Sequence, residues 1–407
     1  MTRTAAAFAL LLALLVAAPA AHGHTFDQAA GLDARAALFP AQAGALLAQK
    51  LGVVRSSPNV EHLGWIAEQG ATSTGGQLVG DYFYVTSWKD IAIYDVSDPV
   101  HPELMSRTSI GFKFENEDVS TNGEVLLFSE QAPSETLHVW DVRDKRAPRE
   151  VGTLPGAGTH TATCLLDCSY EYGSYHLLGP RGPATAGEIV DLRDPSNPRR
   201  AGDWAGGIPG FTGKSHDVTE VAPGRVLTAS MPILFLDARS DVTRPRLLAR
   251  GTNVSKQQHT ARWPNGGRDR FVLTSYETNA HPQCDETSAE FATWDASKWR
   301  STGTFTPIDE FRASNGTFVD GSPPANVLGC SAHWFEAHPD FRDGGLVAVG
   351  FYDHGTKFLR VDRRGQIDEA GWFLPPGAET SAAYWITDEI VYTVDYARGI
   401  DILRVTK

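Results

Sequence analysis

Five residues whose side chains can bind a metal or move a proton recur at one place in a repeated pattern. Each stands near the start of a short β-type segment, in the sequences ENEDV, THTAT, SHDVT, QHTAR and AHWFE. The residues are Glu117, His160, His216, His259 and His333. Neutral imidazoles are ligands for transition metals, and a neighbouring carboxylate can orient an imidazole or exchange a proton. The pattern predicts a metal site with the four histidines as ligands, if the fold brings these positions together.

From about residue 60 the chain consists of repeated units. Seven apolar segments, mostly about 40 to 50 residues apart, mark the third strand of each unit, among them IAIYDVSDP, LHVWDVRD and GEIVDLRDP. A four-strand unit of this period is typical of a β-propeller blade. The Asp that closes most of these strands predicts a turn in which its carboxylate accepts backbone N–H groups.

The first unit resembles a known repeat. Between Tyr84 and Leu104 it has a YVT strand followed by I-x-I-x-D-V-S-D-P and then P-x-L. This pattern looks like the LVIVD repeat of secreted bacterial β-propellers, and the resemblance extends over about residues 60–405, more loosely in the last three units. It implies the fold and no particular activity, because propellers include both binding modules and enzymes.

We therefore expect an all-β, seven-bladed β-propeller closed by an N-terminal strand, with a short N-terminal helical extension. The last unit offers three strands, and residues 60–66 (VEHLGWI) supply a spare strand that would complete it and cover both open sheet edges. The predicted divisions are a signal peptide at 1–20, an Ala-rich extension at 21–58 and the propeller at 59–407.

The N-terminus predicts secretion through a cleaved signal peptide. A basic residue at Arg3 precedes an apolar run from Ala5 to Val16 and a small-x-small cleavage site at 18–20. This run is too short to span a membrane, and no later apolar segment is long enough.

Propeller geometry predicts which further residues lie near the five repeated positions. The first strand of a blade starts on the face where the second strand ends, so the two sets of residues share one funnel. The second-strand ends are Trp88, Glu130, Tyr276, Glu277, Asp353, His354, Asp395 and Tyr396, and two further strand starts are Thr74 and Ser381. We expect Glu117 and Glu277 to act as orienting or acid/base (catalytic) groups. Asp217 should point away from the channel because side chains alternate along a strand.

The predicted cofactor is a divalent transition metal, with iron or copper favoured because zinc normally has fewer histidines and a water. A redox metal would imply an oxygen-dependent oxidoreductase. One alternative is a water-filled channel whose histidines bond to ordered solvent. Another is a noncatalytic extracellular scaffold that binds a protein or glycan through loops at 274–290 and 303–330.

Composition limits the classes of partner. The 407-residue chain has a formal net charge of -13 and no large Lys/Arg cluster, which argues against nucleic acid and favours a small molecule or metal ion. Four cysteines in an exported chain predict disulfides, most economically Cys164–Cys168 and Cys284–Cys330. The alternative for Cys330 is a free thiol ligand near His333.

Overall fold

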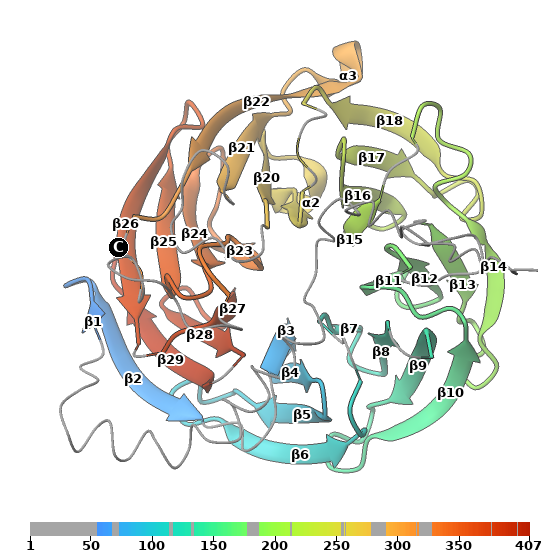
Figure 1. Ribbon diagram of the computed structural model, residues 1–407, viewed down its shortest axis with the longest axis horizontal. Coiled ribbons are helices and arrows are strands. Elements are labelled where there is room, and N and C mark those ends of the chain that lie inside the picture. Colours follow the sequence, from blue (N-terminus) through green and yellow to red (C-terminus); the bar gives the residue numbers. More distant parts are fainter. Residues whose placement is uncertain are drawn as a thin grey trace, which may run out of the picture.

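The strands form a ring of seven four-stranded blades around a central axis (Figure 1). This computed structural model describes residues 55–66, 73–113, 117–131, 134–176, 187–211, 214–253, 256, 258–277, 290–314, 316, 328–375, 377–396 and 398–407. The predicted all-β, seven-bladed propeller is confirmed. The predicted signal peptide and nearly all of the predicted extension lie outside the described residues.

The first four blades have antiparallel strands in chain order from the axis to the rim. Blade one contains β3 (Ser73–Val79), β4 (Tyr82–Ser87), β5 (Asp90–Asp95) and β6 (Glu103–Ser109). Blade two contains β7 (Ser120–Thr121), β8 (Val125–Glu130), β9 (Thr136–Asp141) and β10 (Arg149–Pro155). Blade three contains β11 (Ala162–Leu165), β12 (Tyr170–Gly173), β13 (Glu188–Asp191) and β14 (Arg199–Asp203). Blade four contains β15 (Ser215–Ala222), β16 (Arg225–Ser230), β17 (Leu234–Asp237) and β18 (Arg246–Gly251).

Blades five to seven continue the ring, and two short helices lie in blade five (Figure 1). Blade five contains β19 (Thr260–Arg262), α2 (Pro264–Gly267), β20 (Phe271–Ser275), β21 (Phe291–Asp295), α3 (Trp299–Thr302) and β22 (Thr304–Phe311). Blade six contains β23 (Phe335–Ala337), β24 (Gly345–Gly350), β25 (Thr356–Val361) and β26 (Ile367–Leu374). Blade seven contains β27 (Thr380–Trp385), β28 (Ile390–Asp395) and β29 (Gly399–Val405).

The N-terminal part of the described chain closes the ring. Strand β2 (Val60–Ile66) pairs antiparallel with β29, with Val60 opposite Val405, and so becomes the outer strand of blade seven. This is the predicted closure. Strand β1 (Arg55–Ser56) pairs with β26 and adds a fifth strand to blade six. The N-terminal segment therefore holds two blades together at the closure.

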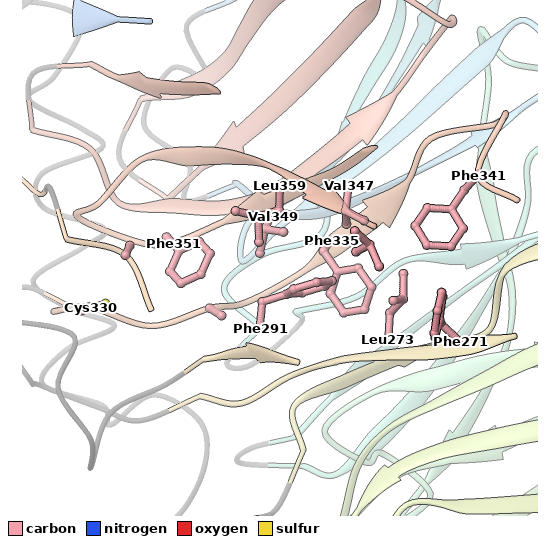
Figure 2. Packing of buried hydrophobic residues seen from close by; sticks show 13 residues of the cluster. Phe271, Leu273, Phe291, Cys330, Phe335, Phe341, Val347, Val349, Phe351 and Leu359 are labelled. Atoms are coloured by element: carbon pink, nitrogen blue, oxygen red, sulfur yellow. The ribbon is translucent and has the colours of Figure 1, made fainter. Parts of the chain in front are cut away.

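Packing between blades explains the pattern of burial. The second strands, such as β4 and β8, are buried at nearly every position because both of their faces contact a neighbouring blade. The outer strands β6 and β10 are exposed or half-buried at every position. Figure 2 shows one such inter-blade core, in which Phe271 and Phe291 of blade five pack with Phe335 and Val349 of blade six. These rigid contacts fix the positions of the inner strands.

The predicted Asp turns are present in six blades. In the first, Asp95 Oδ1 accepts the backbone N–H of Ser97 at 2.9 Å. The equivalent acceptors are Asp141, Asp191, Asp237, Asp295 and Asp362. The repeated Asp is therefore a turn-forming residue. Among the residues described, no helix has the length and apolar character needed to cross a membrane.

Candidate metal centre

The four predicted histidines and Glu117 lie together where the inner strands of blades two to six begin. We call Glu117, His160, His216, His259 and His333 the axial histidine cluster. All five side chains are buried, with at most 1% of each residue exposed. The repeat places three of the histidines in the same way, because each backbone N–H donates to a carbonyl near the end of its blade's second strand, at 2.8 Å.

The Glu117 carboxylate lies among the four imidazoles. Its Oε2 is 2.9 Å from Nε2 of His160, 3.7 Å from that of His259 and 3.8 Å from that of His216. Its Oε1 is 3.2 Å from His333 Nε2, and the Nε2 atoms of His160 and His216 are 2.8 Å apart. A metal about 2.0–2.2 Å from each ligand has neighbouring ligand atoms about 3 Å apart and opposite ones about 4 Å apart. Each of these five separations lies in the range between two ligands of one metal ion.

Three overlapping groups of these residues could hold a metal ion, and in each group the ligand atoms lie within 4.8 Å of one another. The groups are Glu117–His259–His333, Glu117–His160–His216 and His216–His259–Glu277. Any two of the groups have one residue in common, Glu117, His216 or His259, so the three possible sites adjoin one another.

The outward ring nitrogens fix the orientation of the imidazoles. His333 Nδ1 donates to the Ser381 carbonyl at 2.8 Å, because a carbonyl oxygen only accepts. A neutral His333 therefore directs the Nε2 lone pair at Glu117. Two other rings have outward partners, His160 with Gln131 Oε1 at 3.2 Å and His259 with Thr260 Oγ1 at 2.7 Å. Outward hydrogen bonds of this kind are typical of histidines that bind metals.

The electrostatics of the cluster favour a cation. Burial, together with the charges of His259 and His160, holds the pKa of His216 well below its ordinary value. Burial and His333 lower the pKa of His259 to about 4. Burial alone would raise the pKa of Glu117, but His333 and His160 keep it well below its usual range. At neutral pH the cluster therefore contains the Glu117 carboxylate and the lone pairs of His216 and His259, which a metal cation would stabilise.

Glu277 lies beside the cluster, and two tyrosines contact the two acids. Glu277 Oε2 is 3.7 Å from His216 Nε2, and its Oε1 accepts the Tyr352 hydroxyl at 2.5 Å. The Tyr396 hydroxyl donates to Glu117 Oε1 at 2.9 Å. Both acids are thus placed by the predicted strand positions and held by phenol hydrogen bonds.

Other predicted funnel residues make separate contacts. Glu130 forms an ion pair with Lys113 at 3.1 Å, and Asp353 pairs with its neighbour His354 at 2.6 Å. Asp395 accepts the backbone N–H of Glu379. Three more have contacts in their own or adjacent blades, Thr74 with Thr86, Tyr276 with Lys256 and Trp88 with Tyr396. A suitable position in the repeat is therefore not sufficient to place a residue in the axial histidine cluster.

Sequence reasoning missed Tyr352, Tyr175 and Trp334. The Tyr175 ring stacks on His160 with centroids 4.9 Å apart, and Trp334 lies 5.0 Å from His259. The signal for the tyrosines was the Tyr that recurs where second strands end, in GSY (Tyr175), TSY, GFY (Tyr352) and VDY. Trp334 directly follows His333 and carries no repeat signal.

Farther along the same inner strands the axis contains a second polar region. A cavity of about 380 Å³ is lined there by residues that include Asp118, Arg262 and Glu336. Asp217 is not part of the cluster, because its Oδ2 accepts Arg262 Nη1 at 2.8 Å. We call Asp118, Asp217, Arg262 and Glu336 the acidic chamber.

The three cysteines that the structure describes are disulfide-bonded. Cys164–Cys168 is present as predicted, and Cys330 is also disulfide-bonded, so the free-thiol alternative for Cys330 is wrong. Its predicted partner, Cys284, lies outside the described residues, and so do most of the two loops considered for a protein or glycan partner.

Comparisons with known proteins agree with this architecture. Residues 77–109 match the LVIVD repeat. A search of curated proteins found no significant match. Among solved structures, "Crystal structure of RRP9 WD40 repeats" is similar with a TM-score of 0.56 at 9% identity, covering 88% of this chain and 100% of that one. "Structure of U3-55K" has a TM-score of 0.54 at 8% identity, covering 86% of this chain and 99% of that one. A computationally designed protein, Ika8, has a TM-score of 0.51 at 11% identity, covering 85% and 100%. At these identities the likeness shows the fold alone, a β-propeller that carries an LVIVD repeat.

Proposed function

We propose that this protein binds a divalent transition metal at the axial histidine cluster and acts as a metal-dependent oxidoreductase. The observation that carries the proposal is the convergence of four imidazole Nε2 atoms on one carboxylate, at 2.9–3.8 Å from its oxygens. Buried nitrogen and carboxylate donors without a cation would repel one another, and a bound metal removes that repulsion.

The donor set favours iron or copper. Magnesium and calcium prefer oxygen ligands, and zinc sites typically have four ligands or three with a water. Four histidines with Glu117 would supply five donors. Such a metal, when bound, provides Lewis acidity and one-electron redox chemistry. Glu117 would complete the ligand set, and Glu277, beside His216 and His259, would serve as the acid/base group.

Metal analysis tests the proposal directly. Protein purified without chelator should contain close to one equivalent of iron or copper, and His216→Ala His259→Ala protein should contain almost none. A single His259→Gln variant, which removes one nitrogen ligand with less loss of volume, should bind metal more weakly. Negligible metal in all three proteins, after supplementation with iron and copper salts, would overturn the proposal.

His338 provides a matched control. It is a buried histidine away from the axis, with Nε2 2.9 Å from the Asp388 carbonyl and Nδ1 2.9 Å from the Asp340 backbone nitrogen. His338→Gln should lose some stability and keep its metal. If His338→Gln loses as much metal as the double variant, the loss reflects unfolding and not ligation. Oxygen uptake by metal-loaded protein with added reductant then tests the redox part.

We also propose that the protein is exported, because residues 1–20 have the features of a cleaved signal peptide. N-terminal sequencing of protein expressed with its natural leader should find a start near residue 21. An intact Met1 on the folded protein would contradict export by cleavage.

A further inference from the structure

A chain of aromatic rings connects one side of the axial histidine cluster to the surface. The His333 ring lies 4.8 Å from Tyr352 and 6.0 Å from Tyr396, between centroids. Tyr352 and Tyr396 are 5.9 Å apart, and Tyr396 is 6.1 Å from Trp88. Trp88 is fully buried beneath Phe112, which is 6.2 Å away and 47% exposed. Successive rings are therefore in the contact range of packed aromatic side chains.

Each tyrosine in the chain has a carboxylate positioned to take its proton. The Tyr352 hydroxyl donates to Glu277 at 2.5 Å, and the Tyr396 hydroxyl donates to Glu117 at 2.9 Å. The Tyr352 hydroxyl is the donor in its bond to Glu277, so the ring is a phenol and not a phenolate. A phenol gives up an electron much more readily when its proton can move at the same time to a hydrogen-bonded base.

We propose that Tyr352, Tyr396 and Trp88 form an electron relay between the metal centre and a soluble one-electron donor at the surface near Phe112. The proposal rests on the proposed function, because it needs a redox metal on the axis. It gives Tyr352 and Tyr396 a role in electron transfer, whereas binding of the metal requires neither residue. The acids serve the relay as proton acceptors over hydrogen bonds that already exist.

Electrons and protons balance if hydrogen peroxide is the oxidant that is reduced at the axial histidine cluster. Hydrogen peroxide takes two electrons and two protons, its O–O bond breaks, and two waters form. Tyr352 and Tyr396 each give one electron and one proton, which leaves two phenoxyl radicals. Each radical then regains one electron through Trp88 from an external donor such as ascorbate, and one proton that originates from solvent. Two donor electrons and two solvent protons thus complete the cycle.

The other aromatic contacts of the cluster do not offer the same path. Tyr175 stacks on His160, and the Lys214 ammonium lies 5.2 Å from the centre of its ring, where the positive charge opposes removal of an electron. Trp334 contacts His259, but the Arg262 guanidinium lies 5.6 Å above its ring. A positive charge there opposes removal of an electron from Trp334. Tyr175 is therefore a matched control for the relay tyrosines.

Flash oxidation of zinc-loaded protein tests the relay without a redox metal. A ruthenium tris-bipyridine photo-oxidant in solution should oxidise Trp88, and the oxidation should pass inward to give phenoxyl radicals seen by transient absorption and electron paramagnetic resonance. Trp88→Phe should reduce the yield of interior phenoxyl radical at least tenfold. Tyr352→Phe Tyr396→Phe should abolish it, and Tyr175→Phe should match the wild type.

The outcomes separate the relay from the proposed function. Equal phenoxyl yields in the wild type, Trp88→Phe and the double tyrosine variant, all shown to be folded by circular dichroism, would overturn the relay whatever metal is bound. Zinc does not change oxidation state, so this result leaves the metal site untouched. Conversely, if the protein binds no iron or copper but still passes oxidation from Trp88 to the two tyrosines, the relay is supported and the proposed function is contradicted.

With iron or copper bound, a second measurement follows the relay in its working direction. After one addition of hydrogen peroxide, ascorbate should quench the phenoxyl signal at least tenfold more slowly in Trp88→Phe than in the wild type or Tyr175→Phe. Equal rates in all three proteins would show that electrons enter by another route.

Discussion

The axial histidine cluster and the acidic chamber are built from the same inner strands and differ in the source of their cation. The chamber contains its own, because Arg262 Nη1 lies 2.8 Å from the buried Asp217 carboxylate. The cluster combines Glu117 with imidazoles whose burial disfavours protonation. Buried carboxylates must be compensated in either place. Buried carboxylates on a propeller axis therefore indicate a bound cation where the protein supplies no permanent cation of its own.

Removal of Arg262 gives the largest expected effect. Arg262→Met leaves Asp217 buried without its cation and should lower the free energy of unfolding by about 3 kcal/mol, at the low end for a buried pair because Arg262 is partly exposed. Urea denaturation measures this loss. Metal content should not change, because Arg262 belongs to the chamber and not to the cluster.

Asp217→Asn provides the second half of this test. Combined with Arg262→Met, it removes the stranded charge and should restore part of the lost stability. If the single Arg262→Met variant is as stable as the wild type, or if it loses its metal, the two regions are not the independent units that the comparison assumes.

Metal removal should have the next largest effect, and it should act on the cluster alone. A ligand present at about 100 times its dissociation constant stabilises the folded state by about 2.7 kcal/mol. Chelation should therefore lower the stability of the wild type and of Arg262→Met by the same amount. Thermal unfolding with and without chelator should show no difference for His216→Ala His259→Ala. A chelator effect of equal size in that variant would place the metal elsewhere.

The fold was predictable to the level of blade number and closure, because those features depend on local patterns. The Asp that ends a third strand forms its turn with residues close in sequence, as Asp95 does with Ser97. The spare strand at 60–66 was visible because the last unit lacked one. Local periodicity thus determined the architecture.

The site was predictable in part, since the repeat gives the register of a strand but not the contacts between blades. The four histidines stand at the same position of the repeat, the start of the inner strand, and a closed ring brings these positions together. Tyr352 reaches Glu277 from a different blade, over 75 residues of sequence, and only the packing of the ring sets that contact. The same reason explains why Glu130 and Asp353, in equally suitable positions, bond elsewhere.

A third buried acid, Glu171, is neutralised by a proton instead of a cation. Glu171 is fully buried, and burial together with the charge of Glu188 raises its pKa well above the ordinary value. The folded state therefore holds this proton at pH values where the unfolded chain has lost it. The contribution of Glu171 to stability should therefore fall as the pH rises above about 4.3, the pKa of an unfolded Glu, towards the folded pKa.

Glu171→Gln removes this dependence. The gap in unfolding free energy between the variant and the wild type should be small near pH 4 and grow with pH, by about 1.4 kcal/mol for each unit of pKa shift. Denaturation curves at several pH values measure the gap. Glu103→Gln, at an exposed ion pair, should show a flat difference. A flat difference for Glu171→Gln as well would mean that Glu171 is ionised, and that some cation compensates it.

The smallest expected effect concerns the outward hydrogen bonds of the cluster. Thr260→Val keeps the side-chain shape but removes the hydroxyl 2.7 Å from His259 Nδ1, and it should weaken metal affinity about tenfold. Ser381→Ala should leave affinity unchanged, because the shorter bond of His333 Nδ1, at 2.8 Å, goes to the Ser381 carbonyl and survives the substitution. Competition with a chelating dye measures both affinities. An equal loss of metal affinity in the two variants would indicate that affinity depends on general packing and not on the hydrogen bond that orients each imidazole.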